Sequence, residues 1–457
     1  MQTNTNGAGT GSQQSDWQAS RRSVLSSIGA AAGIGLFSER GQAQTGAGLP
    51  GAGALYFVTT GVGQSNGNSN GNGNGNQSGN GNSNGTDYLV LDGDRGSVAF
   101  TTGGTADEAF QYAFDNVPDS GGVVIAGADT FRFGGPATMG DNTALTGQQG
   151  TRFVAAQTGT GEDPAPSESQ SNPLPTGHDI IRVRGDSAAV TDIEFDANGT
   201  QLDNQAVQAD ECDGVYIAHN RTVNGFQMAL SFTRCTGVTV EHNEIVNPNW
   251  YGITSRAAPT GSDRDLRQSS DVVIAGNRVV GVKFNNIAPY NVSNFAVVGN
   301  IAVDGGHSLI ACSPAQRGTI VGNVCRDLTE FAPDPGGEAG IEIEYKETHL
   351  REEVAGTTEA RSSDITISGN QVDNCPVGIL ARTVPADAED TNARTEERPY
   401  SFTITGNTVS DASAAGIRLR SGDAGVVATN TVRNAGTAID IDAEYTAGIE
   451  QGLNVTR

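Results

Sequence analysis

Lysine is nearly absent from this chain. Only Lys283 and Lys346 occur among its 27 basic residues, and 52 acidic residues leave a formal net charge of −25 over 457 residues. Nucleic-acid binding needs a basic face for the phosphates, so this balance argues against a nucleic-acid partner. An acidic, lysine-poor composition is typical of proteins from high-salt environments, where surface carboxylates stay hydrated and salt screens their repulsion. We therefore predict a halophilic origin, with an acidic protein from ordinary salt as the alternative.

Cysteine is scarce and forms no metal-binding motif. The chain has five cysteines, an odd number that leaves at least one unpaired, and no C-x-x-C spacing that would indicate a metal site. Cys212 and Cys235 are 23 residues apart, which equals the repeat length found below, so they should lie one above the other. This arrangement is within reach of a disulfide bond. A stacked pair of free thiols is the alternative, and the sequence leaves both open.

No apolar run is long enough to span a membrane. The weakly apolar segment that follows Ser20–Leu25 (SRRSVL) runs to Phe37. Ser and Gly interrupt it, and it is shorter than the roughly 20 residues that a membrane helix needs. The arginine pair and the segment after it resemble a twin-arginine export signal. We predict a signal region at 1–44, no membrane span and a secreted or cell-surface protein; a chance arginine pair is the alternative.

Apolar residues are also missing from a stretch close to the N-terminus. Residues 63–86 consist almost wholly of Gly, Asn, Ser and Gln. Such a segment has nothing to bury and should behave as a flexible tether. We predict a disordered linker over 45–86 and one folded domain over 87–457.

What the sequence does contain is a repeat. Short runs of alternating apolar residues recur from about Val190 to Ile441, and each repeat has a turn that ends in Asn. Neighbouring asparagines of the series are 22, 23, 34, 23, 23, 47, 37 and 23 residues apart. A modal step with excursions mainly upward indicates a solenoid with loop insertions. The series comprises Asn198, Asn220, Asn243, Asn277, Asn300, Asn323, Asn370, Asn407 and Asn430.

The repeats predict strands. Segments such as Val238–Val240, Ile365–Ile367 and Phe402–Ile404 have β-branched or aromatic residues with a period of two. The Gly and Asn residues between them tolerate the left-handed backbone that a tight corner needs. One coil cannot bury its own apolar face, but stacked coils about 4.8 Å apart share a continuous core. Stacked corner asparagines would also hydrogen-bond from coil to coil.

This pattern resembles the right-handed parallel β-helix proteins of the pectate-lyase-like superfamily, from roughly Asp107 to the C-terminus. The resemblance implies an all-β solenoid, a right-handed parallel β-helix. The Gly-Asn corner is characteristic of the architecture and of no single activity, so the asparagines themselves are expected to be structural.

An amphipathic helix should precede the repeats. Thr105–Glu108 has a capping-box pattern, and apolar residues follow at helical spacing up to Val117, before Pro118. A strand at Gly122–Ala126 comes next. In the superfamily that the chain resembles, such a helix caps the N-terminal end of the β-helix. It would shield the first coil from edge-to-edge pairing.

Functional side chains must lie outside the core, and one strand of each repeat offers a candidate surface. In this strand the second and fourth residues should point inward and the third and fifth outward. The insertions 256–270, 326–338, 345–363 and 383–399 all adjoin it, and loops on a rigid scaffold commonly carry specificity. The expected outward residues, stacked along one face, are Asp210, Thr233, Arg256, Tyr290, Cys312, Glu344, Arg382, Arg420 and Asp442, with Glu342, Arg418 and Asp440 beside them.

Glu342, Glu344 and Arg382 are our catalytic candidates on this face. The two glutamates should have Cα atoms about 6.6 Å apart, which does not exclude an acid and a base flanking a water, as in inverting glycosidases. By resemblance to uronate lyases, paired carboxylates also suit Ca²⁺, and an arginine suits a uronate carboxylate or the role of base. The plain alternative is that both glutamates only form ion pairs with Arg382.

Other residues have supporting roles in this hypothesis. Arg256, Tyr290 and Arg420 are the substrate-binding candidates, in a groove walled by the insertions. His307 and His349 are further acid or base candidates, because histidine titrates near neutral pH.

The sequence therefore predicts an exported polysaccharide lyase, hydrolase or epimerase. The motifs of alginate epimerases and polygalacturonases are absent, so the substrate stays open. The first alternative is a non-catalytic surface or adhesion protein that binds a glycan. The second is an accessory protein that handles a metal or cofactor, which the few His and Met residues make the weakest.

Overall fold

The structure is a computed structural model that describes residues 54–61, 87–93, 95–155, 179–199, 205–255, 268–328, 339–346, 361–384 and 397–457. The predicted signal region, most of the predicted linker and the residues Arg256 and His349 lie outside these ranges. Among the described residues, no helix is long and apolar enough to cross a membrane.

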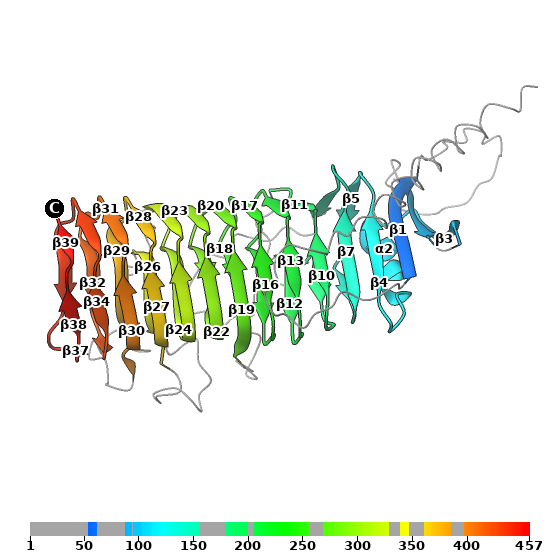
Figure 1. The fold of residues 1–457 in the computed structure, drawn as a ribbon. Coiled ribbons are helices and arrows are strands. Elements are labelled where there is room, and N and C mark those ends of the chain that lie inside the picture. Colours follow the sequence, from blue (N-terminus) through cyan, green and yellow to red (C-terminus); the bar gives the residue numbers. More distant parts are fainter. Residues whose placement is uncertain are drawn as a thin grey trace, which may run out of the picture. The chain divides into compact units, whose positions relative to one another are not determined.

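The chain winds as a right-handed parallel β-helix, in which each coil adds one short strand to each of three sheets (Figure 1). Sheet A contains β1 (Ala54–Gly61), β2 (Asp87–Asp92), β3 (Ser97–Thr102), β4 (Gly122–Ala126), β7 (Thr143–Gly147), β10 (Ala189–Thr191), β13 (Tyr216–Ala218), β16 (Thr239–Glu241), β19 (Ser269–Ala275), β22 (Tyr290–Val298), β24 (Ser308–Val321), β27 (Ser363–Ser368), β30 (Tyr400–Thr405), β33 (Gly422–Asp423), β34 (Val426–Ala428), β37 (Thr446–Ala447) and β38 (Glu450–Gly452).

Sheet B follows sheet A in each coil, and sheet C follows sheet B. Sheet B contains β5 (Thr130–Phe133), β8 (Arg152–Ala155), β11 (Glu194–Asp196), β14 (Arg221–Val223), β17 (Glu244–Val246), β20 (Arg278–Val282), β23 (Ile301–Gly305), β25 (Val324–Leu328), β28 (Gln371–Asp373), β31 (Thr408–Ser410), β35 (Thr431–Arg433) and β39 (Val455–Thr456). Sheet C contains β6 (Ala137–Met139), β9 (Ile181–Val183), β12 (Gln205–Asp210), β15 (Met228–Thr233), β18 (Tyr251–Thr254), β21 (Asn285–Ala288), the first part of β24, β26 (Ala339–Lys346), β29 (Val377–Val384), β32 (Ala415–Leu419) and β36 (Thr437–Ile441).

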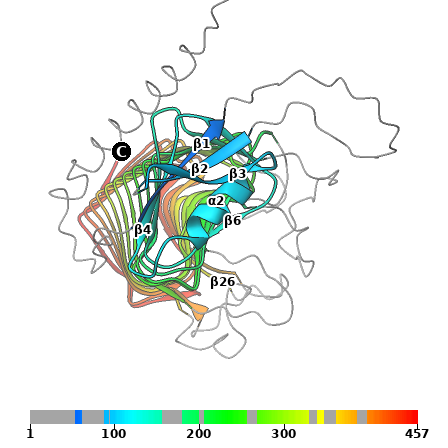
Figure 2. The ribbon, with the colours of Figure 1, turned by 90° about the vertical axis from the view of Figure 1, so that its right-hand side faces the viewer.

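The predicted helix is α2 (Ala106–Asp115), which lies over the first coils of the β-helix (Figure 2). Its Phe110 ring packs 4.8–5.5 Å from the rings of Phe131, Phe133 and Phe153, centroid to centroid. The helix therefore closes the N-terminal end of the core with an aromatic cluster. The predicted capping box is wrong in detail, because Thr105 makes no side-chain cap and Glu108 accepts a hydrogen bond from Thr102 instead.

Part of the segment predicted to be a linker forms strand β1. It pairs antiparallel with β2 and parallel with β4, and its Phe57 and Val58 are buried. The apolar run at residues 54–58 (ALYFV) has the period and composition of an edge strand, which the polar stretch after it obscured. The folded region therefore begins before the predicted boundary at residue 87.

The corner asparagines between sheets A and B form a ladder that runs from Asn220 to Asn454. At each step the Oδ1 atom of one asparagine accepts hydrogen bonds from the backbone N–H and the Nδ2 of the asparagine before it, at 2.9–3.2 Å. The preceding corner residue is left-handed, with φ of 63–67° at five glycines and 55–57° at His219 and His242. The ladder asparagines are Asn220, Asn243, Asn277, Asn300, Asn323, Asn370, Asn407, Asn430 and Asn454.

One predicted ladder residue is misplaced and one was missed. Asn198 lies after β11, at the other end of sheet B, and Ile193 holds the ladder position of that coil. Asn454 continues the ladder one coil beyond the predicted series. The error at Asn198 came from spacing, because its distance of 22 residues from Asn220 is close to the repeat.

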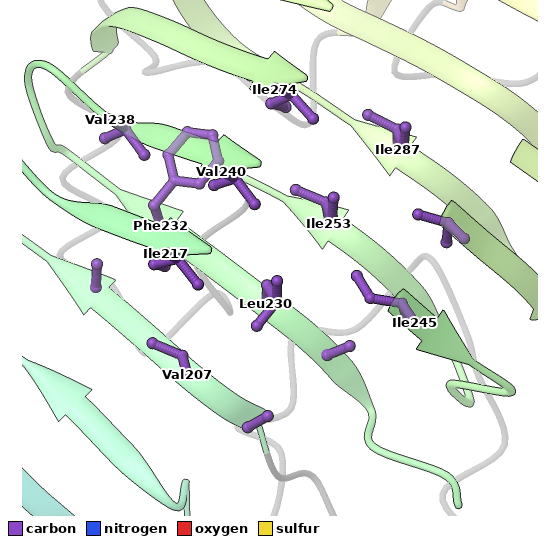
Figure 3. Close-up of a cluster of buried hydrophobic side chains, with 14 of the residues drawn as sticks. Val207, Ile217, Leu230, Phe232, Val238, Val240, Ile245, Ile253, Ile274 and Ile287 are labelled. Carbon is purple, nitrogen blue, oxygen red and sulfur yellow. The ribbon is translucent and has the colours of Figure 1, made fainter. Parts of the chain in front are cut away.

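Inward residues of the three sheets form one continuous core. In sheet C, Val207, Leu230, Ile253 and Ile287 stack in register, and Figure 3 shows them in line through successive coils. Cys212 and Cys235 belong to this core and are both free thiols. Of the two alternatives for this pair, the structure contains the stacked thiols.

Candidate functional site

The outer face of sheet C, between β18 and β29, carries two clusters of buried side chains that are separate from the core. The first is aromatic and consists of Met228, Trp250, Tyr251, Phe284, Ala288, Tyr290 and Ala311. The Trp250 and Phe284 rings stack with centroids 4.5 Å apart, and Tyr251 packs edge-on to Phe284 and Tyr290. Aromatic residues on the outside of a β-helix do not contribute to its core, so this cluster belongs to the candidate surface.

Asn285 links the aromatic cluster to a polar network. Its Nδ2 donates to the Tyr290 hydroxyl at 2.6 Å. Its Oδ1 accepts a hydrogen bond from the Ser308 backbone N–H at 2.8 Å and lies 3.1 Å from Nδ1 of His307. The His307 ring also packs against Phe284, with centroids 4.3 Å apart. Asn285 therefore fixes the position of His307 and the start of β24.

Glu342 is the centre of the polar network. It lies on β26 with 0% of its surface exposed, between the inward residues Ile341 and Ile343. Its Oε2 accepts a hydrogen bond from the Ser308 hydroxyl at 2.6 Å, and its Oε1 accepts one from Nε of Arg382. Arg382 also donates from Nη2 to Glu344 Oε2 at 3.3 Å. One guanidinium thus joins both carboxylates, in a fork geometry that suits arginine.

Glu342 stays ionised despite its burial. Burial raises the pKa of a carboxyl group, but the positive charge of Arg382, the nearby His307 and the hydrogen bond from Ser308 outweigh it, and the pKa of Glu342 is lowered from its usual value. The network therefore holds a charged carboxylate in a dehydrated environment.

The structure brings together four of the six predicted site residues. Glu342, Glu344, Arg382 and Tyr290 lie on the outer face of sheet C, within the span of β22 to β29. Arg420 is exposed in the next coil, and no ion pair links its side chain to another described residue. Arg256 lies outside the described residues.

Two details of the predicted surface need correction. Cys312 is an inward residue opposite Ile343, so Ser313 takes the outward position beside Tyr290. The catalytic candidates are also buried, with Glu342 and Glu344 at 0% and 2% exposure, where we expected a solvent-filled groove. The register error arose because Leu309 and Ile310 are both apolar, and a period of two does not choose between them.

Sequence analysis missed several members of the site. Asn285 and Ser308 lie two residues before the inward residues Ile287 and Ile310, and so on the same face as Glu342. Trp250 and Phe284 lie in the turns that lead into β18 and β21. The pattern could have indicated Asn285 and Ser308 had the outward positions been counted one step further towards the N-terminus.

The network does not suit Ca²⁺. Both carboxylates are already joined to the Arg382 guanidinium, and a calcium site needs six to eight oxygen ligands without a competing cation. Across the described ranges, no three His, Cys, Asp or Glu side chains are placed to hold a metal ion.

Residues 264–451 match the family model described as "Periplasmic copper-binding protein (NosD)". This match covers the coils that carry the polar network. No curated protein matches the chain.

Solved structures of similar fold come from proteins of different activity. The surface protein and adhesin PfbA of Streptococcus pneumoniae matches with a TM-score of 0.52 and 13% identity, over 77% of this chain and 96% of its own. A polygalacturonase from Erwinia carotovora ssp. carotovora matches with a TM-score of 0.51 and 14% identity, over 76% and 94%. A hyperthermoactive exopolygalacturonase from Thermotoga maritima matches with a TM-score of 0.51 and 11% identity, over 76% and 87%. At these identities the likeness establishes the pectate-lyase-like right-handed β-helix fold alone.

Proposed function

We propose that this is an exported protein that binds a polysaccharide on sheet C and cleaves or epimerises it there, with Glu342, Glu344 and Arg382 as the reacting groups. The observation that carries the proposal is the buried Glu342–Arg382–Glu344 network on the outer face. The fold does not require charge at this place, because Ala311 and Leu380 hold the positions on either side of Glu342. A buried ion pair is weak evidence for stability, so we attribute this one to function.

The chemistry of the network fits acid–base work on a sugar chain. Glu342, kept ionised, suits the base, and Glu344 on the same face suits the acid partner. Arg382 suits a uronate carboxylate, which it would bind with the same two-pronged geometry that it now uses for the glutamates. Export is supported by the arginine pair at Arg21 and Arg22 and the segment after it.

Burial of the network has a kinetic consequence. Because Glu342 and Tyr290 are 0% and 3% exposed, a polymer reaches them only after the residues that cover this face move. Binding that requires a conformational change is slower than ordinary protein association. We therefore expect slow association that does not approach the diffusion limit.

The test is incubation in high salt with polygalacturonate, alginate and a neutral glucan. We expect new reducing ends, an unsaturated product or an epimer from one of them, and a loss of at least about 100-fold in rate for Glu342→Gln and Glu344→Gln. Glu244→Gln, on the exposed face of sheet B, is the matched control and should keep full activity. No product from any polymer would contradict an enzymatic role.

An alternative without catalysis is supported by the fold it shares with the adhesin PfbA. In that case the protein binds a glycan without turnover, and Glu342→Gln and Glu344→Gln leave the affinity unchanged.

A metal-handling role is supported by the match of residues 264–451 to a copper-binding family. Equilibrium dialysis of the full chain against Cu²⁺ separates it from the other two. Stoichiometric retention of copper without polymer binding would favour it.

A further inference from the structure

Ser313 is a buried hydroxyl on the same face as the polar network. It lies on β24 opposite Tyr290 of the coil before. The residue before it, Cys312, is opposite Ile343, so Ser313 comes next to Glu344 of the coil after. Its side chain therefore lies between the aromatic cluster and the carboxylates.

The Ser313 hydroxyl has 0% exposure and no hydrogen-bond partner in the structure of the ligand-free chain. Ser308 on the same strand is a direct contrast, because its hydroxyl donates to Glu342 at 2.6 Å. Buried polar groups are nearly always hydrogen-bonded, and an unsatisfied one destabilises the protein. Alanine would fill the same space without this cost, so the fold gives no reason for serine at this position.

We propose that Ser313 binds a hydroxyl group of the sugar that occupies the site, and that it determines specificity. This inference rests on the proposed polysaccharide function. A serine hydroxyl has one donor and two acceptor positions, which match the donor and acceptor capacity of a sugar hydroxyl. A site built to hydrogen-bond a substrate hydroxyl strongly rejects the analogue that lacks it.

The proposal predicts that stability and binding change in opposite directions in Ser313→Ala. Without ligand, the variant should melt about 1–3 °C above the parent, because an unsatisfied group is removed. Its Kd or KM for the polymer should rise about 10-fold or more, with kcat changed less. Ser308→Ala is the matched control, and it should melt below the parent because it removes a hydrogen bond to a buried charge.

The experiment combines thermal unfolding of the full chain with titration by polygalacturonate and alginate. A lower melting temperature for Ser313→Ala would show that the hydroxyl is already satisfied and would overturn the proposal. A higher melting temperature with unchanged affinity would overturn it too, because the sugar would not use the group. If the parent chain binds neither polymer while the gain in stability is present, the polysaccharide function fails, and the sugar assignment of Ser313 fails with it.

Discussion

Sheets B and C carry the same kind of charge pattern on their outer faces, in very different environments. On sheet B, Arg and Glu alternate through five coils in a stack whose ion pairs measure 2.7–3.6 Å, with side chains 32–51% exposed. On sheet C, Glu342, Arg382 and Glu344 pair in the same coil-to-coil manner with side chains 0–15% exposed. The stack on sheet B is Arg152, Glu194, Arg221, Glu244 and Arg278.

The difference teaches that coil-to-coil stacking alone does not give a charge its role. In water-exposed pairs, screening and side-chain entropy cancel most of the attraction. In a buried network, each charge depends on its partner, because water is not available to replace it. The sheet B stack is therefore a solvated surface, whereas the sheet C network is a place where single substitutions have large effects.

The largest effect should follow from Arg382→Ala. It leaves Glu342 and Glu344 without their shared cation in a buried environment, and breaking such a pair costs about 3–5 kcal/mol. Chemical denaturation of the parent and the variant measures this. The triple variant with Glu342→Gln and Glu344→Gln should recover part of the loss, and equal stability of the single and triple variants would contradict the interpretation.

A somewhat smaller loss is expected for Asn300→Ala in the middle of the asparagine ladder. The Asn300 side chain accepts two hydrogen bonds from Asn277 and donates to Ile274 O and Asn323, all of them buried. At about 1 kcal/mol for each bond, the loss should be roughly 2–4 kcal/mol. Asn454→Ala, at the half-buried last step, is the control and should lose less.

The buried network should also make stability depend on pH. The pKa of Glu342 is lowered in the folded state, so its contribution is present above the unfolded pKa and is lost as the pH falls through the folded value. We expect acid unfolding below the ordinary carboxyl range to be less steep in Glu342→Gln.

Asp179 provides the opposite case. Burial raises its pKa, even though Arg182 acts against the shift, so the folded state takes up the proton first and this group favours stability as the pH falls. Asp179→Asn should therefore steepen the acid loss. The same direction of change in both variants would contradict these assignments.

The smallest effect should come from Arg221→Ala in the exposed stack on sheet B. Its ion pairs with Glu194 and Glu244 are half exposed, and such pairs contribute less than about 1 kcal/mol each. The difference from the parent should shrink further in molar salt, because salt screens exposed charges. A loss as large as that of Arg382→Ala would remove the distinction between the two sheets.

Much of the fold was predictable because its determinants are local and repeated. The Gly-Asn corners and the β-branched runs predicted a right-handed parallel β-helix, and the apolar face before Pro118 predicted the capping helix. The errors occur where two registers look alike: Asn198 fits the spacing but not the ladder, and Leu309 competes with Ile310 for the inward position. Only the backbone hydrogen bonds of the neighbouring coils decide such cases.

The candidate site was predictable in part. Stacking placed Glu342, Glu344 and Arg382 on one face. Asn285, Ser308 and Ser313 were missed, because a polar residue on an outward strand position is ordinary until its burial and partners are known.

The sequence by itself determined the period, the sheet-forming runs and the asparagine corners, since these follow from side-chain shape and backbone preference within a few residues. Only the tertiary structure decided which outward charges are buried. Burial depends on residues many coils or loops away in the chain, and it separates the exposed stack of Arg221 from the dehydrated network of Glu342.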